Sequence, residues 1–379
     1  MNSDFLLSND NISNYKNEEK YFAASNSSEG FYSYYKDVFS HDKGGIDVLY
    51  VVIGGPGTGK NRFMRNVADM AEKKGFEVKY YYCSSDPNSL DGVILDLGEH
   101  RKIGVIDGTA PHTYASQLPG AVERTVDLGA FWNESELSKY KKTLERLNGQ
   151  KSSAFKSAYS YLSAYASVME NVERISRRVL LVDKMKKNAQ RYIKAIPSGS
   201  GYRARPALVS SVGMNGAVRF DTFERRANNL YILSDYCDTA HIMAGELLRL
   251  VREKEQAVTV AYDPVLPNRV EGFFVENTKT AFIIGDYGRC IKADDGRTVK
   301  NINMHRFVDC NKYATLKRDM LTANRHAHSL MDSALKCFAD VSRSHFAIEE
   351  IYIGNMDFTS KEKFASDFCD KLFFESIRH

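Results

Sequence analysis

The fold is decided by residues 48–61, which read VLYVVIGGPGTGKN. The apolar run at 48–53 is typical of a strand with both faces covered, as in a parallel sheet. Residues 62–74 carry apolar side chains at helical spacing, and further strands are predicted at 77–83 and 103–106. This order of strand, loop, helix and strand predicts an α/β layer with a right-handed crossover.

The loop after the first strand matches the phosphate-binding pattern Gly54-x-x-x-x-Gly59-Lys60. Glycines let backbone N–H groups approach phosphate oxygens, and the start of the following helix adds its own N–H groups and dipole. The Lys60 ammonium is predicted to bind the β- and γ-phosphates. A glycine-rich turn without a ligand is the alternative. The residues expected to contact a nucleotide are Gly54, Gly55, Pro56, Gly57, Thr58, Gly59, Lys60, Asn61 and Arg62.

Three side chains are candidate ligands of a magnesium ion. Asn61 stands where the pattern calls for Ser or Thr, and an amide does not fully replace that hydroxyl, so nucleotide binding is better supported than fast turnover. Asp107, at the end of a predicted strand, either holds the ion through water or begins a turn with Gly108. Asp86 either ligates the metal or orients water, or it caps the turn that it forms with Pro87.

His112 completes the set of candidate catalytic residues, with Lys60, Asp107 and Asp86. It follows the Asp107 strand closely enough to approach a γ-phosphate, although a histidine in a loop is more often only exposed. Gly108 stands where many ATPases carry the glutamate that activates water.

The first half of the sequence begins again after a linker at residues 197–206. Four segments match in order at a nearly constant offset, which predicts an internal duplication. Residues 24–30 match 210–216, 49–52 match 230–233, 91–95 match 271–275 and 105–107 match 284–286, at offsets of 186, 181, 180 and 179.

The second copy of the loop, residues 235–242, reads DYCDTAHI. It contains no glycine and no lysine, and its two carboxylates would repel phosphate. His241 is aligned with Lys60. The repeat is therefore expected to keep the fold and to lose the nucleotide.

Helices are expected to follow each sheet. Residues 137–169 have helical spacing, with Gly149 placed to divide them into an antiparallel hairpin, and a helical run at 313–351 repeats it. The predicted fold is α/β, with internally duplicated, mostly parallel P-loop NTPase-like sheet domains, each followed by an α-helical hairpin. The predicted segments are 1–20 (flexible), 21–133 (P-loop domain), 134–196 (helical hairpin with a basic end), 197–206 (linker), 207–310 (degenerate P-loop-like domain) and 311–379 (C-terminal helices).

The composition is that of an ordinary globular protein of 379 residues, 43% hydrophobic and 26% charged. No apolar run approaches the roughly 18 residues of a membrane-spanning helix, and the N-terminus lacks the pattern of a signal peptide. Six scattered cysteines without a CxxC pair favour a reduced, cytoplasmic protein. The net charge of +4 does not indicate nucleic acid, although residues 174–205 are strongly basic.

Five segments together carry a resemblance to a known family: 54–60, 83–91 (CSSDPNSLD), 107–112 (DGTAPH), 119–123 (PGAVE) and 128–132 (LGAFW). They resemble a poorly characterised family of tandem P-loop ATPases of Firmicutes, over most of the chain. The resemblance implies a nucleotide-binding protein with ATPase activity. Members generally carry Ser or Thr after the lysine and often a second intact loop, and this sequence departs from them on both counts.

The function expected from these observations is a slow ATPase that binds ATP and Mg²⁺ and whose nucleotide state moves the helical hairpins. One alternative is a P-loop phosphotransferase (kinase) for a small acceptor, with Asp86 or His112 at the acceptor hydroxyl. The other is a module that binds nucleic acid or a protein partner through the basic segment 174–205, for which a solvated helix face is the simpler interpretation. The choice between ATP and GTP, the source of any arginine finger and the oligomeric state stay open.

Overall fold

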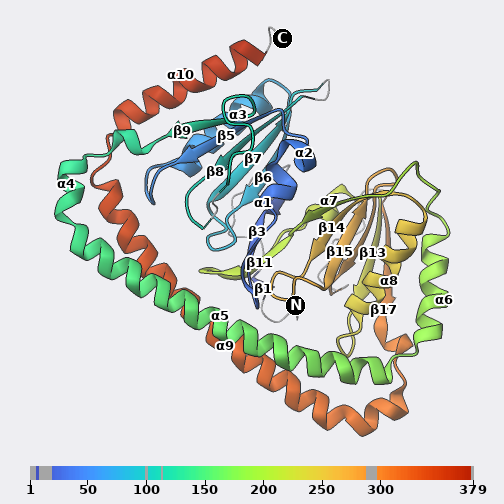
Figure 1. The fold of residues 1–379 in the computed structure, drawn as a ribbon. Coiled ribbons are helices and arrows are strands. Elements are labelled where there is room, and N and C mark those ends of the chain that lie inside the picture. The colour runs from blue at the N-terminus through green and yellow to red at the C-terminus, as the bar shows by residue number, and fades with distance from the viewer. Residues whose placement is uncertain (1–5, 8–18, 99–100, 112–113, 287–296, 377–379) are drawn as a thin grey trace.

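Two α/β halves lie on the same side of a long pair of helices (Figure 1). The computed structural model describes residues 6–7, 19–98, 101–111, 114–286 and 297–376, so most of the expected flexible segment 1–20 lies outside the described residues. The short elements are β1 (Leu6–Leu7), α1 (Tyr35–Phe39), α2 (His41–Gly44), η3 (Gly129–Phe131), α4 (Glu134–Lys139), α7 (Thr222–Arg226) and η4 (Met304–Phe307).

The first half is built on a six-stranded sheet. The order across it is β2 (Glu19–Phe22), β6 (Glu77–Tyr82), β7 (Leu90–Asp96), β8 (Lys102–Asp107), β5 (Val48–Ile53) and β9 (Glu123–Asp127). β7 runs antiparallel to both neighbours, and the other neighbouring pairs are parallel. Strand β5, which lies between β8 and β9, is buried along most of its length, as its apolar run predicts.

The second half repeats this sheet strand for strand. The order is β10 (Arg203–Ala207), β14 (Ala257–Tyr262), β15 (Val270–Val275), β16 (Thr280–Ile284), β13 (Asn229–Ser234) and β17 (Thr298–Asn303). Here β15 is the antiparallel strand, and the register irregularity between Tyr81 and Tyr82 recurs between Ala261 and Tyr262. The predicted duplication is therefore confirmed. β10, an edge strand, takes up the last part of the stretch 197–206 that was expected to be a linker.

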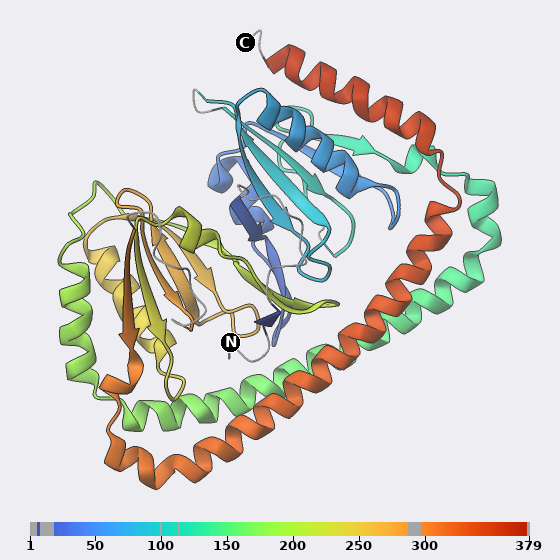
Figure 2. The ribbon, with the colours of Figure 1, turned by 180° about the vertical axis from the view of Figure 1, so that it is seen from behind.

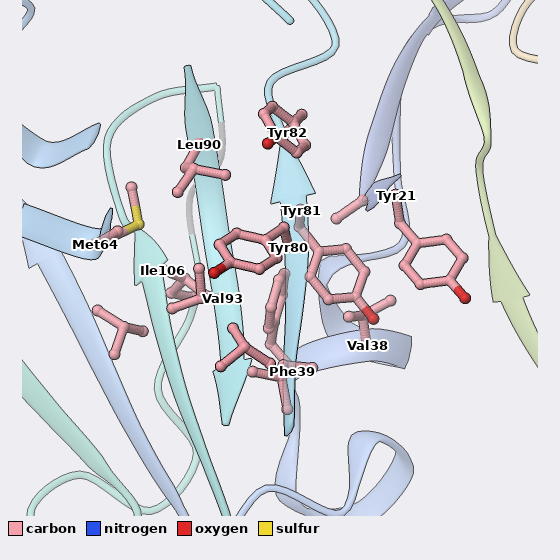
Figure 3. Close-up of a cluster of buried hydrophobic side chains, with 14 of the residues drawn as sticks. Tyr21, Val38, Phe39, Met64, Tyr80, Tyr81, Tyr82, Leu90, Val93 and Ile106 are labelled. Carbon is pink, nitrogen blue, oxygen red and sulfur yellow. The ribbon is translucent and has the colours of Figure 1, made fainter. Parts of the chain in front are cut away.

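The aromatic core of the first half is centred on β6 (Figure 3). Its side chains alternate between the two faces of the sheet. Tyr80 faces helix α3 (Lys60–Lys73), where its hydroxyl donates to Glu72 Oε1 at 2.9 Å. Tyr81 faces the opposite side, with its ring centroid 5.0 Å from that of Phe39. This packing holds α3 across the sheet, with its N-terminus directly after the loop that follows β5.

The two hairpins expected from the sequence do not form. Instead α5 (Lys141–Val179) and α9 (Cys310–Ile353) run unbroken and pack antiparallel along one another, and we call this pair the helical arm (Figures 1 and 2). Their apolar faces meet around Phe155 and Phe338, whose ring centroids are 6.1 Å apart. Gly149 lies inside α5, because one helical glycine costs only about 1 kcal/mol relative to alanine and the packing of the arm outweighs that.

Each half sends its long helix across to the other half. After α5, helix α6 (Val182–Ile193) packs on α8 (Ala240–Glu253) of the second half. After α9, helix α10 (Phe358–Ser376) packs on α3 of the first half, where Phe63 meets Phe364 and Phe368. The helix that follows each long helix, α6 after α5 and α10 after α9, therefore packs on the opposite half.

The two ends of the arm make equivalent hydrogen bonds. The Asn133 N–H donates to the Asn355 carbonyl at 2.9 Å, and the Asp309 N–H donates to the Val179 carbonyl at 2.8 Å. The two donors, Asn133 and Asp309, are 176 positions apart in the sequence, and the two acceptors, Val179 and Asn355, are separated by the same number. The two helical segments between these junctions are therefore equal in length and can be compared residue by residue at this spacing.

Two small hairpins connect the halves at the centre of the molecule. They consist of β3 (Ala24–Ser27) with β4 (Gly30–Ser33), and of β11 (Ser210–Gly213) with β12 (Gly216–Arg219). Their tips are exchanged: Ser28 N–H donates to the Val265 carbonyl in the second half, and Met214 N–H donates to the Ser85 carbonyl in the first. A Cβ on Gly213 would lie 2.5 Å from the Ser84 carbonyl oxygen, so only glycine allows this close approach.

Candidate functional site

A cavity of about 870 Å³ lies at the glycine-rich loop, residues 54–59, which joins β5 to α3. Its walls come from both halves of the chain. The loop, the segment after β6 and the end of β8 form one side, and residues of α5, α9 and the β11–β12 tip form the other. Helix α10 adds Phe358 beside the loop. The site predicted from one local motif is thus closed by elements far away in the sequence.

The glycine-rich loop is shaped by its glycines and holds Lys60 at its centre. Gly54, Gly57 and Gly59 have φ values of 146°, 73° and 79°, which other residues rarely adopt. The Lys60 ammonium donates to the carbonyl oxygens of Gly54 and Gly55, each at 2.8 Å. It lies at the first turn of α3, so the ammonium and the positive end of the helix dipole face the same region.

Asp107 lies beside Lys60 and also begins a turn, so both roles considered for it are compatible with its position. Its Oδ2 is 3.6 Å from Lys60 Nζ, and its Oδ1 accepts a hydrogen bond from Thr109 N–H at 2.7 Å. The Thr109 hydroxyl donates in turn to the Gly54 carbonyl at 2.7 Å. Thr109 thus connects the end of β8 to the loop, a role that was not assigned to it from the sequence although it stands two residues after the predicted Asp107.

Asn61 and Asp86 line the cavity but are engaged with the backbone of the β6–β7 connection. Asn61 Oδ1 accepts from Leu90 N–H at 3.2 Å, and its Nδ2 donates to the Asn88 carbonyl at 3.4 Å. Asp86 Oδ1 accepts from Asn88 N–H at 3.2 Å, as a turn-capping aspartate does. In the part of the chain that the structure describes, no group of three or more His, Cys, Asp or Glu side chains could hold a metal ion.

The other predicted site residues have individual places. Thr58 donates its hydroxyl to the Gly55 carbonyl at 2.9 Å, and Pro56 lines the cavity. Arg62 points to α10, where its Nε lies 3.3 Å from Glu362 Oε1. His112 lies outside the described residues, so its predicted role stays a prediction.

The helical arm places three charged or titratable side chains in the cavity that sequence reasoning missed. Lys151 on α5 lies with its Nζ 3.2 Å from Nδ1 of His345 on α9. One turn further along α9, the Glu349 carboxylate accepts a hydrogen bond from the Gly57 N–H of the glycine-rich loop. The sequence signal that could have identified Lys151 is its spacing: it stands four residues before Phe155 and therefore lies on the apolar face of its helix.

Burial shifts the pKa values of all three side chains. It lowers the pKa of Lys151, and the neighbouring Lys60 ammonium lowers it further. Burial, followed by the two lysines, lowers the pKa of His345 to about 4, so this imidazole is neutral at pH 7. Burial and the Asp86 carboxylate raise the pKa of Glu349. Perturbed groups gathered in one cavity are typical of functional sites.

The second half fills the corresponding position with its own carboxylate. Asp235 accepts hydrogen bonds from the N–H groups of Asp238, Thr239 and Ala240, at 3.1, 2.9 and 2.8 Å, and so occupies the N-terminus of α8. An anion site of this kind satisfied by the protein's own side chain repels a second anion. The loop of the second half thus lacks the free glycine backbone and lysine of the first, in line with its sequence.

The structure changes two alignments between the repeats. α3 and α8 begin at Lys60 and Ala240, and both have 14 residues, so Ala240 rather than His241 is the counterpart of Lys60. Gly108 N–H donates to the Val52 carbonyl as Gly285 N–H donates to that of Leu233, which makes Ile284 rather than Asp286 the counterpart of Asp107. The loop before α8 (235–239) is one residue shorter than the loop before α3 (54–59), and the β15–β16 connection of the second half is shorter than the β7–β8 connection of the first. Both differences shift the alignment of the two halves, which the four short sequence matches did not reveal. The second half therefore lacks the lysine and the strand-end aspartate alike.

A network of ion pairs lines a smaller cavity, of about 440 Å³, between α5 and the second half. Arg269 pairs with Asp238 at 2.9 Å and with Glu173 of α5 at 3.0 Å. His241 Nε2 lies 3.4 Å from the same glutamate. These side chains hold the loop to the arm without an added ligand.

The basic segment 174–205 does not form one face. It runs from the end of α5 through α6 to the edge strand β10. Arg177 is paired with Glu173 at 2.7 Å, and Lys184 donates to the Arg306 carbonyl at 2.8 Å. Arg203 and Arg205, the last basic residues of the segment, lie on β10 and do not line the cavity at the glycine-rich loop.

None of the helices in the described residues combines the length and the apolar character that crossing a membrane requires. The chain was also compared with models of protein families, with curated proteins and with solved structures. None of the three comparisons found a match.

Proposed function

We propose that the first half binds ATP through residues 54–62 and hydrolyses it slowly with Mg²⁺. The observation that carries the proposal is the position of Lys60. Its ammonium is held by the Gly54 and Gly55 carbonyls inside a loop of positive-φ glycines and lies 3.6 Å from the Asp107 carboxylate, in a cavity of about 870 Å³. A polyphosphate is the ligand whose charge and size this arrangement fits best.

Catalysis in such a site would come from positioning and from neutralising charge. Lys60 and the loop N–H groups would hold the phosphates, and Asp107 is the carboxylate placed nearest to them. Mg²⁺, when bound, supplies further neutralisation of the phosphate oxygens. Asn61 fits the ion poorly, because both ends of its amide are engaged with the β6–β7 connection. Slow turnover is therefore expected.

A phosphotransferase is a second candidate, favoured by the walls of the cavity beyond the loop. Phe155, Tyr159 and Met214 also line the cavity and add apolar and aromatic surface to it. Such a surface can accept a base or a second small molecule. Release of inorganic phosphate without any added acceptor supports the ATPase, whereas ATP consumption that depends on an acceptor supports the transferase.

The proposal is tested by thermal unfolding with ATP, GTP and ADP, each with and without Mg²⁺. A ligand at a hundred times its Kd stabilises the folded state by about 2.7 kcal/mol, which raises the Tm by several degrees. Lys60→Ala should abolish this rise and phosphate release. Lys73→Ala, at the exposed far end of α3, is the matched control and should retain both. A Lys60→Ala protein stabilised by ATP as strongly as the unmodified protein would reject the proposal.

A further inference from the structure

Lys151 has no role in the glycine-rich loop motif, yet it lines the same cavity as Lys60. It lies on α5, one turn before Phe155, and its ammonium is directed to Nδ1 of His345 at 3.2 Å. The side chain is largely buried between the two helices of the arm. A buried ammonium is costly unless an anion or several hydrogen bonds compensate it.

The described surroundings of Lys151 supply little compensation. Among the described residues no carboxylate forms an ion pair with its ammonium, and its close partner His345 is neutral at pH 7. Glu349 attracts it from a greater distance, and Lys60 repels it. Lys60 is already paired with Asp107 at 3.6 Å, whereas Lys151 has no close carboxylate among the described residues, and an anion bound between the two lysines would supply Lys151 with a negative partner.

The repeat supplies an independent observation. At the spacing of 176 positions that relates the two helices of the arm, the counterpart of Lys151 is Ala327, which is buried in the arm. The second half thus lacks this lysine together with the counterparts of Lys60 and Asp107. At this position the arm supplies a lysine to the half that retains the glycine-rich loop and an alanine to the other half.

We propose that Lys151 is the second phosphate-binding cation of this site and contacts the terminal phosphate of the nucleotide held by Lys60. This inference rests on the proposed ATP binding by the first half. Lys151 is supplied by the arm and not by the sheet domain, so the γ-phosphate is the group through which α5 would be bound to the nucleotide. The same helix carries Glu173 22 residues further on, about 33 Å away at 1.5 Å per residue, in the ion-pair network of the second half.

The test compares the Kd values of ATP and ADP for four proteins: unmodified, Lys151→Ala, Lys151→Arg and Lys142→Ala. Lys142 is exposed near the start of the same helix and is the matched control. Lys151→Ala should weaken ATP binding by about tenfold or more and ADP binding by about twofold, since a charge-assisted hydrogen bond to one phosphate is lost. Lys151→Arg should recover part of the loss for ATP.

A wild-type measurement keeps the test independent of how the variants fold. Lys151 should react with an amine-acylating reagent at neutral pH in the free protein, and mass spectrometry should show stronger protection by ATP than by ADP. Equal losses of ATP and ADP affinity in Lys151→Ala, unchanged ATP affinity, or equal protection by the two nucleotides would overturn the inference while leaving the proposed function in place. A protein that binds neither nucleotide would overturn both.

Discussion

Glu173 and Glu349 are counterparts in the two repeats, 176 positions apart, and each reaches the loop of the opposite half. Glu173 leaves the first half on α5 and pairs with Arg269 of the second half at 3.0 Å. Glu349 returns on α9 and accepts a hydrogen bond from Gly57 N–H in the glycine-rich loop of the first half. The exchanged helices thus deliver one carboxylate to each loop, with different partners.

The two glutamates have different partners because the two loops differ in sequence. In the second half, Asp235 occupies the N-terminus of α8 and Glu173 joins a closed set of ion pairs. In the first half, Glu349 lies against the loop where a polyphosphate is proposed to bind, and the Lys60 ammonium acts on its pKa. An incoming phosphate would therefore compete with Glu349.

Glu349→Gln should bind ATP about fivefold more tightly than the unmodified protein at pH 7. The substitution keeps a hydrogen-bond acceptor for Gly57 but removes a negative charge. At a separation of about 4 Å, two unit negative charges repel each other by about 1 kcal/mol even at the dielectric constant of water. Equilibrium titration with ATP measures the change. Glu350→Gln is the matched control, because Glu350 is exposed and does not line the cavity. Weaker binding by Glu349→Gln would contradict the competition.

The advantage of Glu349→Gln should shrink as the pH falls. Burial and Asp86 raise the pKa of Glu349, while Lys60 and Lys151 oppose that rise. A bound polyphosphate raises it again, so the complex holds more protons than the free protein and affinity increases as the pH falls through the pKa of Glu349. Titrations at several pH values above the ordinary glutamate pKa of about 4.3 check this, and parallel profiles of the two proteins would contradict it.

Glu173→Gln should lower the free energy of unfolding at pH 7 by about 1 kcal/mol, because Arg269 and His241 lose a charged partner. His241, followed by Arg177, lowers the pKa of Glu173 below its ordinary value. A lowered pKa contributes its full stability above the unfolded-state value of about 4.3, and this stability is lost progressively as the pH falls from that value through the lowered pKa of the folded state.

Urea unfolding at pH 7 and at about pH 3.5 should therefore show a difference between Glu173→Gln and the unmodified protein that is smaller at the second pH than at the first. Glu170→Gln, exposed one turn earlier on α5, serves as the control. A difference that grows on acidification would be the opposite of this expectation.

Two glycine substitutions test the unbroken helix and the exchanged hairpins. Gly149→Ala should raise the free energy of unfolding by up to about 1 kcal/mol, since Gly149 is exposed inside α5 and a Cβ there meets nothing within 4 Å. Gly213→Ala should lower it by about 1–3 kcal/mol, since its Cβ would lie 2.5 Å from the Ser84 carbonyl oxygen. Chemical denaturation measures both, and a destabilised Gly149→Ala protein would indicate a break in the helix.

The parts of the fold that depend on neighbouring residues could be predicted from the sequence. The strand over Val48–Ile53 and the helix after the glycines follow from a change of apolar periodicity within 26 residues, 48–73. The duplication was detectable because the sheets kept their pattern. Lys60 and Asp107 were each assigned from the sequence to the same phosphate and magnesium site, and their side chains lie 3.6 Å apart because the ends of adjacent parallel strands share one edge of a sheet.

The arm and its contributions could not be predicted in the same way. An apolar helical face is satisfied equally by a hairpin within one half and by a long partner from the other, so periodicity does not choose between them. The glycine at position 149 favoured the hairpin, and tertiary packing outweighed it. Lys151 and Glu349 enter the site only through the crossing of α5 and α9, which no local pattern encodes.

The most direct test of the account is the stoichiometry of ATP binding measured by isothermal titration calorimetry in the presence of Mg²⁺. We expect one ATP per chain, no binding by Lys60→Ala, and unchanged binding by His241→Ala, because the loop of the second half is filled by Asp235. Two sites per chain, no binding at all, or binding by Lys60→Ala that equals that of the unmodified protein would contradict it.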